Sequence, residues 1–93
     1  HTASFYPGGD NLAAANSPDC KAQVMAINAQ AAGEPRITLT LPLLLAADEI
    51  LLHIEGAEKR AAFEKAVAGD DVLEMPVRSL LKSEKLVKVL WCP

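Results

Sequence analysis

The pattern of apolar and polar positions changes its period along the chain and predicts several short strands. Residues 23–27 (QVMAI) form a short apolar run, and residues 37–40 (ITLT) alternate and are β-branched at three of four positions, which favours extended structure. Residues 49–56 (EILLHIEG) form a longer apolar run that ends at a glycine. Continuous runs of this kind are typical of strands covered on both faces, as in parallel sheets.

Two segments beside this long run have the pattern of helices. The segment from Pro42 is apolar on nearly every side, so we expect a buried helix, and proline is tolerated at a helix start because its missing N–H is not needed there. Residues 57–69 predict an amphipathic helix in which Arg60 and Glu64 pair and Gly69 forms the C-terminal cap. The predicted apolar face of this helix consists of Ala62, Phe63, Ala66 and Val67.

The remaining elements complete an alternating order. Residues 11–16 (NLAAAN) can form one or two helical turns, and another helix is expected to begin at Pro76. Residues 86–93 (LVKVLWCP) predict a final strand, in which Lys88 indicates a position near the edge of the sheet. Strands that alternate with helices in this way predict an α/β fold with right-handed crossovers.

Length, composition and charge restrict the class of protein. The 93 residues correspond to one domain or part of one, yet 51% of them are apolar and these concentrate between Ile37 and Val67. This suggests a core that further protein covers. The net charge of −3 and the absence of a basic cluster argue against nucleic-acid binding. The longest apolar stretch, residues 39–47, is far shorter than the roughly 20 residues that span a bilayer, so no membrane association is expected.

Lys59 is the residue that the predicted topology selects most sharply. In open α/β sheets, ligands bind at the carboxyl ends of the strands. The strand before Gly56 ends there, and Lys59 lies in the first turn of the helix that follows. Free N–H groups and the positive end of the helix dipole make such a helix start a natural seat for phosphate. The alternative interpretation is a solvated surface lysine.

The other candidate residues are weaker on sequence alone. His1 can exchange protons near neutral pH, but a histidine at the first position can also be the remnant of a purification tag. Arg36 suits a bidentate grip on phosphate or carboxylate, and a surface arginine at a loop end is equally consistent with its position. His53 lies inside an apolar run, which favours a packed or edge histidine over a catalyst.

The remaining polar groups give no sign of a metal, a cofactor or a nucleophile. Cys20 and Cys92 are far apart and match no metal-ligand spacing, so we interpret them as two reduced thiols, with a disulfide between them as the alternative. The Asp70–Asp71 pair follows the predicted helix cap and is typical of a solvated turn. The chain contains no P-loop, no Gly-x-Gly-x-x-Gly motif and no nucleophile elbow.

Four stretches together resemble a known family: HTASFYPG, EPRITLTLPLLLAADEILLHIEGAEKR, MPVRSLL and the terminal VLWCP. In this order and spacing they resemble the C-terminal portion of the 6-phosphogluconolactonases, which are related to the glucosamine-6-phosphate deaminases. The resemblance covers nearly the whole chain. It implies a Rossmann-like parallel sheet with flanking helices, of which residues 1–93 are the incomplete C-terminal part of a single domain. The missing N-terminal half would supply the early strands and an acidic residue just before His1.

The resemblance also implies roles for three residues. His1 matches the family's proposed general base, which activates water for attack on the lactone carbonyl. Lys59 matches the lysine of the family's Gly-x-x-Lys segment and would bind the 6-phosphate. Arg36 matches the arginine of a Pro-x-x-Arg stretch, although Pro35 stands directly before it here, and its role is open between binding and structure. Phe5-Tyr6 stands where the family usually has Leu-Phe. No cofactor or metal is implied.

The implied function is hydrolysis of 6-phospho-D-glucono-1,5-lactone to 6-phosphogluconate in the pentose phosphate pathway, in the cytoplasm, with this phosphosugar lactone as the partner. We expect the 93 residues alone to be inactive. One alternative is an amino-sugar phosphate isomerase or deaminase, but that family continues after its histidine to Asn-Glu-Pro, where this chain has Tyr6-Pro7 without the acid. Another is a non-catalytic phosphosugar-binding domain. A chain cut by proteolysis is a third.

Overall fold

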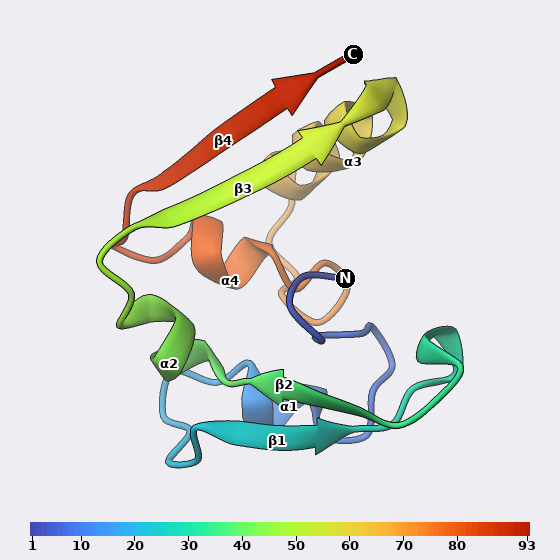
Figure 1. Ribbon diagram of the computed structural model, residues 1–93, viewed down its shortest axis with the longest axis vertical. Coiled ribbons are helices and arrows are strands. Elements are labelled where there is room, and N and C mark those ends of the chain that lie inside the picture. The colour runs from blue at the N-terminus through green and yellow to red at the C-terminus, as the bar shows by residue number, and fades with distance from the viewer.

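The computed structural model describes all of residues 1–93 and divides their strands between two small sheets (Figure 1). Strands β1 (Val24–Ile27) and β2 (Arg36–Leu39) pair antiparallel, and strands β3 (Ile50–Glu55) and β4 (Val87–Cys92) pair parallel. The helices are α1 (Leu12–Ala15), the 3-10 turn η1 (Gln30–Ala32), α2 (Leu41–Leu45), α3 (Gly56–Ala68) and α4 (Arg78–Leu81). None of them has the length and apolar character needed to cross a membrane.

The unit that runs from β3 through α3 and α4 to β4 confirms the predicted α/β class. Its two parallel strands are joined by a helical crossover, and α3 packs against β3. The first two strands differ from the expectation of one parallel sheet, because β1 and β2 form a separate antiparallel pair. Their connection is only eight residues long, from Asn28 to Pro35, and a parallel pair needs a crossover of a dozen or more residues.

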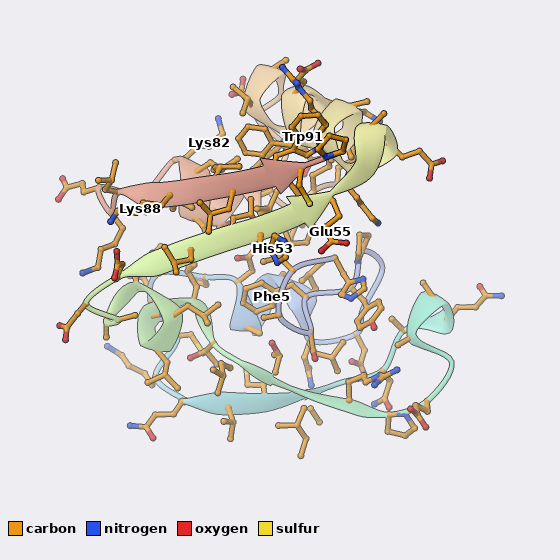
Figure 2. All side chains as sticks on the ribbon, turned by 45° about the horizontal axis from the view of Figure 1, so that its top comes forward. Phe5, His53, Glu55, Lys82, Lys88 and Trp91 are labelled. Atoms are coloured by element: carbon orange, nitrogen blue, oxygen red, sulfur yellow. The ribbon has the colours of Figure 1, made fainter.

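The core lies between the two sheets and is centred on Phe5, which is fully buried (Figure 2). The other members of this cluster come from α1, β1, α2 and α4: Leu12, Ala15, Ile27, Leu41 and Leu80. The N-terminal segment therefore packs as an internal part of the fold rather than as a loose end. Its position beneath β3 is what brings residues 1–7 close to the carboxyl end of that strand (Figure 1).

The expected burial of β3 and α2 was wrong. The burial of β3 alternates, with Ile50, Leu52 and Ile54 half-buried and the residues between them exposed. In α2 only Leu41 is fully buried. A continuous apolar run indicates cover on both faces, but within these 93 residues the alternating burial of β3 shows that one of its faces is more covered than the other.

The turn from β3 into α3 is fixed by a side chain of β4. Gly56 has φ +87°, a conformation that costs little only for glycine, and its carbonyl accepts a 2.8 Å hydrogen bond from the indole N–H of Trp91. The guanidinium carbon of Arg60 lies 4.7 Å from the centre of the Trp91 ring. The Nε of the same arginine lies 3.4 Å from Glu64 Oε1, which is the predicted ion pair. These contacts hold the start of α3 at the end of the sheet.

The later elements follow the predictions with small shifts. Helix α4 begins at Arg78, two residues after the expected start at Pro76. Gly69 ends α3 as predicted, but in an extended conformation rather than the left-handed one usual for such caps. Lys88 lies on β4, whose only partner strand within this structure is β3, and pairs with Glu49 at 2.7 Å.

Candidate active site

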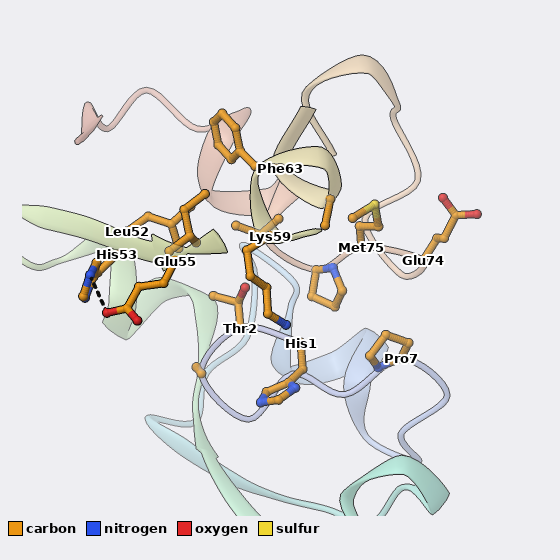
Figure 3. A pocket seen from close by; sticks show the side chains of 15 residues that line it. His1, Thr2, Pro7, Leu52, His53, Glu55, Lys59, Phe63, Glu74 and Met75 are labelled. Carbon is orange, nitrogen blue, oxygen red and sulfur yellow. Dashed lines mark ion pairs between the residues drawn. The ribbon is translucent and has the colours of Figure 1, made fainter. Parts of the chain in front are cut away.

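A cleft of about 540 Å³ lies where the N-terminal segment meets the carboxyl end of β3 (Figure 3). Its walls come from residues 1–3 and Pro7, residues 52–55 of β3, the first two turns of α3, and residues 74–77. The cleft therefore forms at the place where α/β folds bind their ligands. Segments far apart in the sequence meet there.

Lys59 lines this cleft, as the topology predicted. It is the fourth residue of the 13-residue helix α3, and its side chain points toward the N-terminal segment (Figure 3). No side chain caps the start of α3, so the N–H groups of its first turn keep their capacity to bind an anion. A lysine and a helix start of this kind together can hold a phosphate group.

His1 lines the same cleft on the side opposite α3 (Figure 3). The segment that carries it is closely folded: Phe5 N–H donates to Thr2 O at 2.9 Å, and Ser4 N–H donates to the buried Thr38 hydroxyl at 3.2 Å. Ala3 has φ +53°, a strained conformation for a residue other than glycine. The structure thus brings His1 and Lys59 together, which the order of residues along the chain does not show.

The far end of this segment is anchored by Asp10. Its carboxylate accepts hydrogen bonds from the backbone N–H of Asn28 at 2.9 Å and from the Asn28 amide at 3.0 Å. These bonds, the backbone one first, hold the pKa of Asp10 below its ordinary value. Both ends of the segment are therefore attached to the β1–β2 hairpin.

Arg36 does not line the cleft. It lies at the start of β2, where its guanidinium is 3.4 Å from the Glu34 carboxylate and donates to Ala32 O at 3.4 Å. Its Nε is buried without a hydrogen-bond partner. The structure therefore places Arg36 with the η1 loop, apart from His1 and Lys59.

His53 and Glu55 also line the cleft. The sequence favoured a packed or edge role for His53 and did not single out Glu55. Their side chains are exposed and lie 3.3 Å apart, from His53 Nε2 to Glu55 Oε1. The rule that ligands gather at the carboxyl ends of strands applies to Glu55 as well as to Lys59 and could have identified it. Cys92 lies beside this pair on β4, with the potential ligand atoms of the three exposed residues within 4.8 Å of one another. They are the one group in the chain whose spacing could admit a metal ion.

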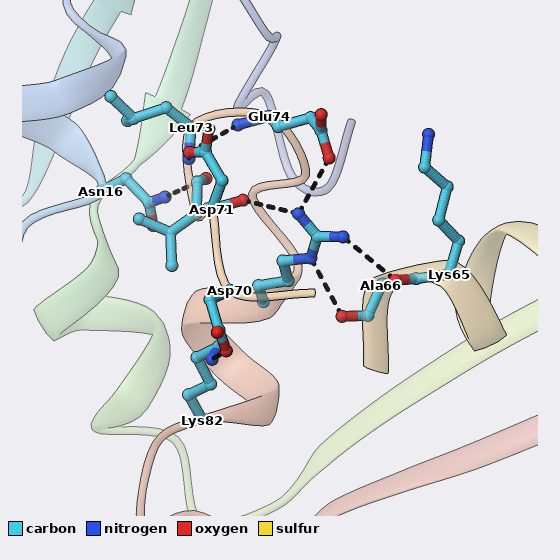
Figure 4. A network of polar contacts seen from close by, with 10 residues as sticks. Asn16, Lys65, Ala66, Asp70, Asp71, Leu73, Glu74 and Lys82 are labelled. Carbon is cyan, nitrogen blue, oxygen red and sulfur yellow. Dashed lines mark hydrogen bonds and ion pairs between the residues drawn. The ribbon is translucent and has the colours of Figure 1, made fainter. Parts of the chain in front are cut away.

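A buried arginine, Arg78, supports the wall of the cleft, and Figure 4 shows its partners Ala66, Asp71 and Glu74. The Arg78 side chain is only 4% exposed, and its guanidinium donates to the carbonyls of Ala66 and Lys65 at the end of α3. It also donates to Asp71 O and to the Glu74 carboxylate, both at 3.0 Å. One side chain thus ties the C-terminal end of α3 to the loop whose residues 74–77 line the cleft.

The approach of Arg78 to α3 requires a glycine. A Cβ at position 69 would lie 2.0 Å from Nη2 of Arg78 and 2.4 Å from its Cζ. Next to this contact, Lys82 donates a hydrogen bond to Asp70, and this bond together with the lysine charge lowers the pKa of Asp70. The loop after α3 is therefore held by two positively charged side chains, Arg78 at the start of α4 and Lys82 directly after its end.

Comparison with known proteins gives one consistent result. Residues 1–91 match the family described as glucosamine-6-phosphate isomerases/6-phosphogluconolactonase. The chain is 40% identical over 94 residues to a 6-phosphogluconolactonase of Rhizobium meliloti and 44% identical to one of Mesorhizobium japonicum. It spans 40% and 39% of their lengths. The chain is also similar to the crystal structure of a 6-phosphogluconolactonase from Shewanella baltica, with a TM-score of 0.91 and 34% identity. The alignment covers 98% of this chain and 39% of the Shewanella protein.

The contact between Gly69 and Arg78 predicts a coupled pair of stability effects. Gly69→Ala should destabilise the chain by about 2 kcal/mol, because the new Cβ displaces the guanidinium from its carbonyl partners. Arg78→Ala should cost about 3 kcal/mol. In the Arg78→Ala background, Gly69→Ala should cost less than about 0.5 kcal/mol, because the three atoms nearest to the new Cβ all belong to the Arg78 guanidinium and are then gone.

Urea unfolding of the two single variants and the double variant measures this coupling. Glu74→Gln is the matched control, because Glu74 is 55% exposed and its loss leaves the three carbonyl bonds of Arg78 intact. It should cost less than about 1 kcal/mol. Strict additivity of Gly69→Ala and Arg78→Ala would show that the close contact is not the cause.

The lowered pKa of Asp10 predicts a stability difference that depends on pH. A carboxylate whose pKa is lower in the folded state stabilises above its unfolded pKa, near 3.8, and the benefit disappears as the pH falls through the folded value. Asp10→Asn should therefore be less stable than the wild type at neutral pH, and the difference should shrink in acid. Chemical unfolding across this range measures it, with Asp19→Asn as control because the Asp19 carboxylate makes no hydrogen bond. A constant difference at every pH would contradict the proposed origin.

Proposed function

The chain belongs to the family of glucosamine-6-phosphate isomerases and 6-phosphogluconolactonases, and from this premise we propose that it is part of a lactonase. The proposed reaction is hydrolysis of 6-phospho-D-glucono-1,5-lactone to 6-phosphogluconate. The relatives named as lactonases, at 40% and 44% identity, support this choice within the family. The observation that carries the proposal is that His1 and Lys59 line one cleft.

Phosphate binding is assigned to the start of α3. Lys59 supplies a full positive charge, and the uncapped first turn supplies N–H groups that point toward an anion. The 6-phosphate of the substrate would bind here. This contact fixes one end of the sugar and orients the lactone carbonyl toward the opposite wall of the cleft, where His1 lies.

His1 is proposed as the general base. Its imidazole takes a proton from a water molecule as the water oxygen forms a bond to the lactone carbonyl carbon. The ester bond between that carbon and the ring oxygen then breaks, and the imidazolium returns the proton to the departing ring oxygen. The product is the open-chain carboxylic acid, which ionises at neutral pH. These steps consume one water molecule and leave no atom or proton unaccounted for.

The remaining assignments complete the proposal. The chain spans about 40% of the length of the curated relatives, and we propose that residues 1–93 are the C-terminal part of a single catalytic domain. The enzyme would act in the cytoplasm, in the pentose phosphate pathway. Arg36 is assigned to the η1 loop rather than to the phosphate, because its guanidinium is engaged with Glu34 and Ala32.

The first competing function is an amino-sugar phosphate isomerase or deaminase, from the same family. It is disfavoured because Tyr6-Pro7 stands where that function would require an acid. A non-catalytic phosphosugar-binding domain is the second. It would keep phosphate binding at Lys59 and show no turnover.

Two substitutions in the full-length protein separate binding from catalysis. Lys59→Ala should raise KM about 10- to 100-fold, because a charge-assisted contact to phosphate is lost. His1→Ala should lower kcat about 10²- to 10⁴-fold with little change in KM, because a general base contributes to the chemical step. Acid release from freshly prepared 6-phosphogluconolactone measures both parameters.

Lys65→Ala is the matched control for the lysine variant. Lys65 lies in the last turn of α3 and its side chain does not line the cleft, so its loss should leave KM unchanged. If the full-length protein binds 6-phosphogluconate without hydrolysing the lactone, the enzymatic proposal is overturned in favour of a binding domain. Unchanged kcat in His1→Ala would remove His1 from its role.

A further inference from the structure

The imidazole of His1 is stacked on a neighbouring aromatic ring. Its centroid lies 4.1 Å from that of the Tyr6 ring, and the two planes differ by 15°. Tyr6 does not itself line the cleft, whereas His1 does. The tyrosine ring therefore lies against the histidine from outside the cleft and leaves the imidazole accessible from within it.

Tyr6 is held firmly enough to serve as a support. Its N–H donates to Ser4 O at 3.1 Å, and its carbonyl accepts from Gly9 N–H at 3.0 Å. The residue is half-buried and packs against the core cluster that contains Phe5. Its position is thus set by the folded segment and by the core together.

The stack is the contact that orients the imidazole within this structure. No hydrogen bond joins the His1 ring to another group of the 93 residues. Without such a contact, rotation about the χ1 and χ2 bonds would leave the histidine ring free to change its orientation. Aromatic rings attract each other beyond simple burial of area, so the stacked orientation is preferred over its rotamers. A general base is effective only when a fixed group orients it toward the reacting proton.

We propose that Tyr6 is a positioning residue, which holds the His1 imidazole in the orientation that faces the cleft. This inference rests on the proposed role of His1 as general base. The support comes from the face of the ring, so the phenolic hydroxyl is not required. Phenylalanine at position 6 should preserve the function, and an aliphatic side chain of similar size should not.

Nuclear magnetic resonance of the full-length protein tests the contact without any assay of activity. A stacked ring moves the imidazole C–H resonances of His1 upfield through its ring current. A His1→Gln variant identifies which signals belong to His1. The upfield shift should persist in Tyr6→Phe and disappear in Tyr6→Leu. Met25→Ala is the matched control, because Met25 packs against the same core cluster as Tyr6 and does not line the cleft.

Kinetics of the full-length protein test the consequence. Tyr6→Leu should lower kcat on the order of tenfold with KM unchanged, because the base is misoriented while the phosphate seat is intact. Tyr6→Phe should retain wild-type kcat. A rise in KM together with a fall in kcat, matched by Met25→Ala, would show a merely structural role and overturn the proposal.

The two measurements keep this proposal separate from the assignment of the reaction. Retention of the upfield shift in Tyr6→Leu would overturn the positioning role whatever the enzyme does. Loss of the shift with unchanged kcat would also overturn it. A wild-type parent without lactonase activity would refute the proposed function, and with it the catalytic purpose of the stack, even if the shift behaves as expected.

Discussion

The buried guanidinium of Arg78 is the interaction on which the shape of the cleft depends. A buried charge is costly unless its hydrogen-bonding capacity is met, and here it donates to three carbonyls and one carboxylate. Two of the carbonyls belong to the last turn of α3, whose final C=O groups have no partner inside the helix. A positive charge at that end also complements the helix dipole. Arg78 therefore completes α3 and fixes the loop after it at the same time.

The two ends of α3 consequently contribute to the cleft in different ways. Its C-terminal end is fastened by Arg78, which sets the course of residues 74–77 along one wall of the cleft. Its N-terminal end emerges from β3 through Gly56, fixed by Trp91, and presents Lys59 with an uncapped first turn. Because both ends of α3 are fixed by these contacts, the position of Lys59 in the cleft depends on how the helix packs. On the opposite wall, the N-terminal segment is built onto Phe5 and the Thr38 hydroxyl and carries His1.

The local pattern of the sequence predicted the elements better than their partners. The strand before Gly56 and the helix with the Arg60–Glu64 pair were confirmed, and the strand-end rule placed Lys59 in the cleft. The predicted apolar face of that helix was wrong in this structure, because only Ala66 is buried and Val67 is 62% exposed. The antiparallel pairing of β1 and β2 was missed, and β3 is less buried within these 93 residues than its apolar run predicted. Periodicity reports which face of a segment is apolar, and it does not report what lies against that face.

The site shows the same limit in chemical terms. The family resemblance selected His1 and Lys59, and the structure brings both to the cleft, while their roles stay predictions. Arg78 was hidden because its partners are backbone carbonyls, which no residue type reveals. Glu55 was overlooked although the rule that selected Lys59 applied to it. The stack of His1 on Tyr6 depends on a turn through the strained Ala3, which the composition of the segment does not indicate.

The most direct test of the account is whether one ligand engages both walls of the cleft. Titration of the full-length protein with 6-phosphogluconate, followed by the amide resonances of residues 56–59 and the imidazole resonances of His1, measures this. The account predicts that both sets shift together along one binding curve. Shifts confined to residues 28–36 around Arg36, or curves with different midpoints for His1 and Lys59, would contradict a single site.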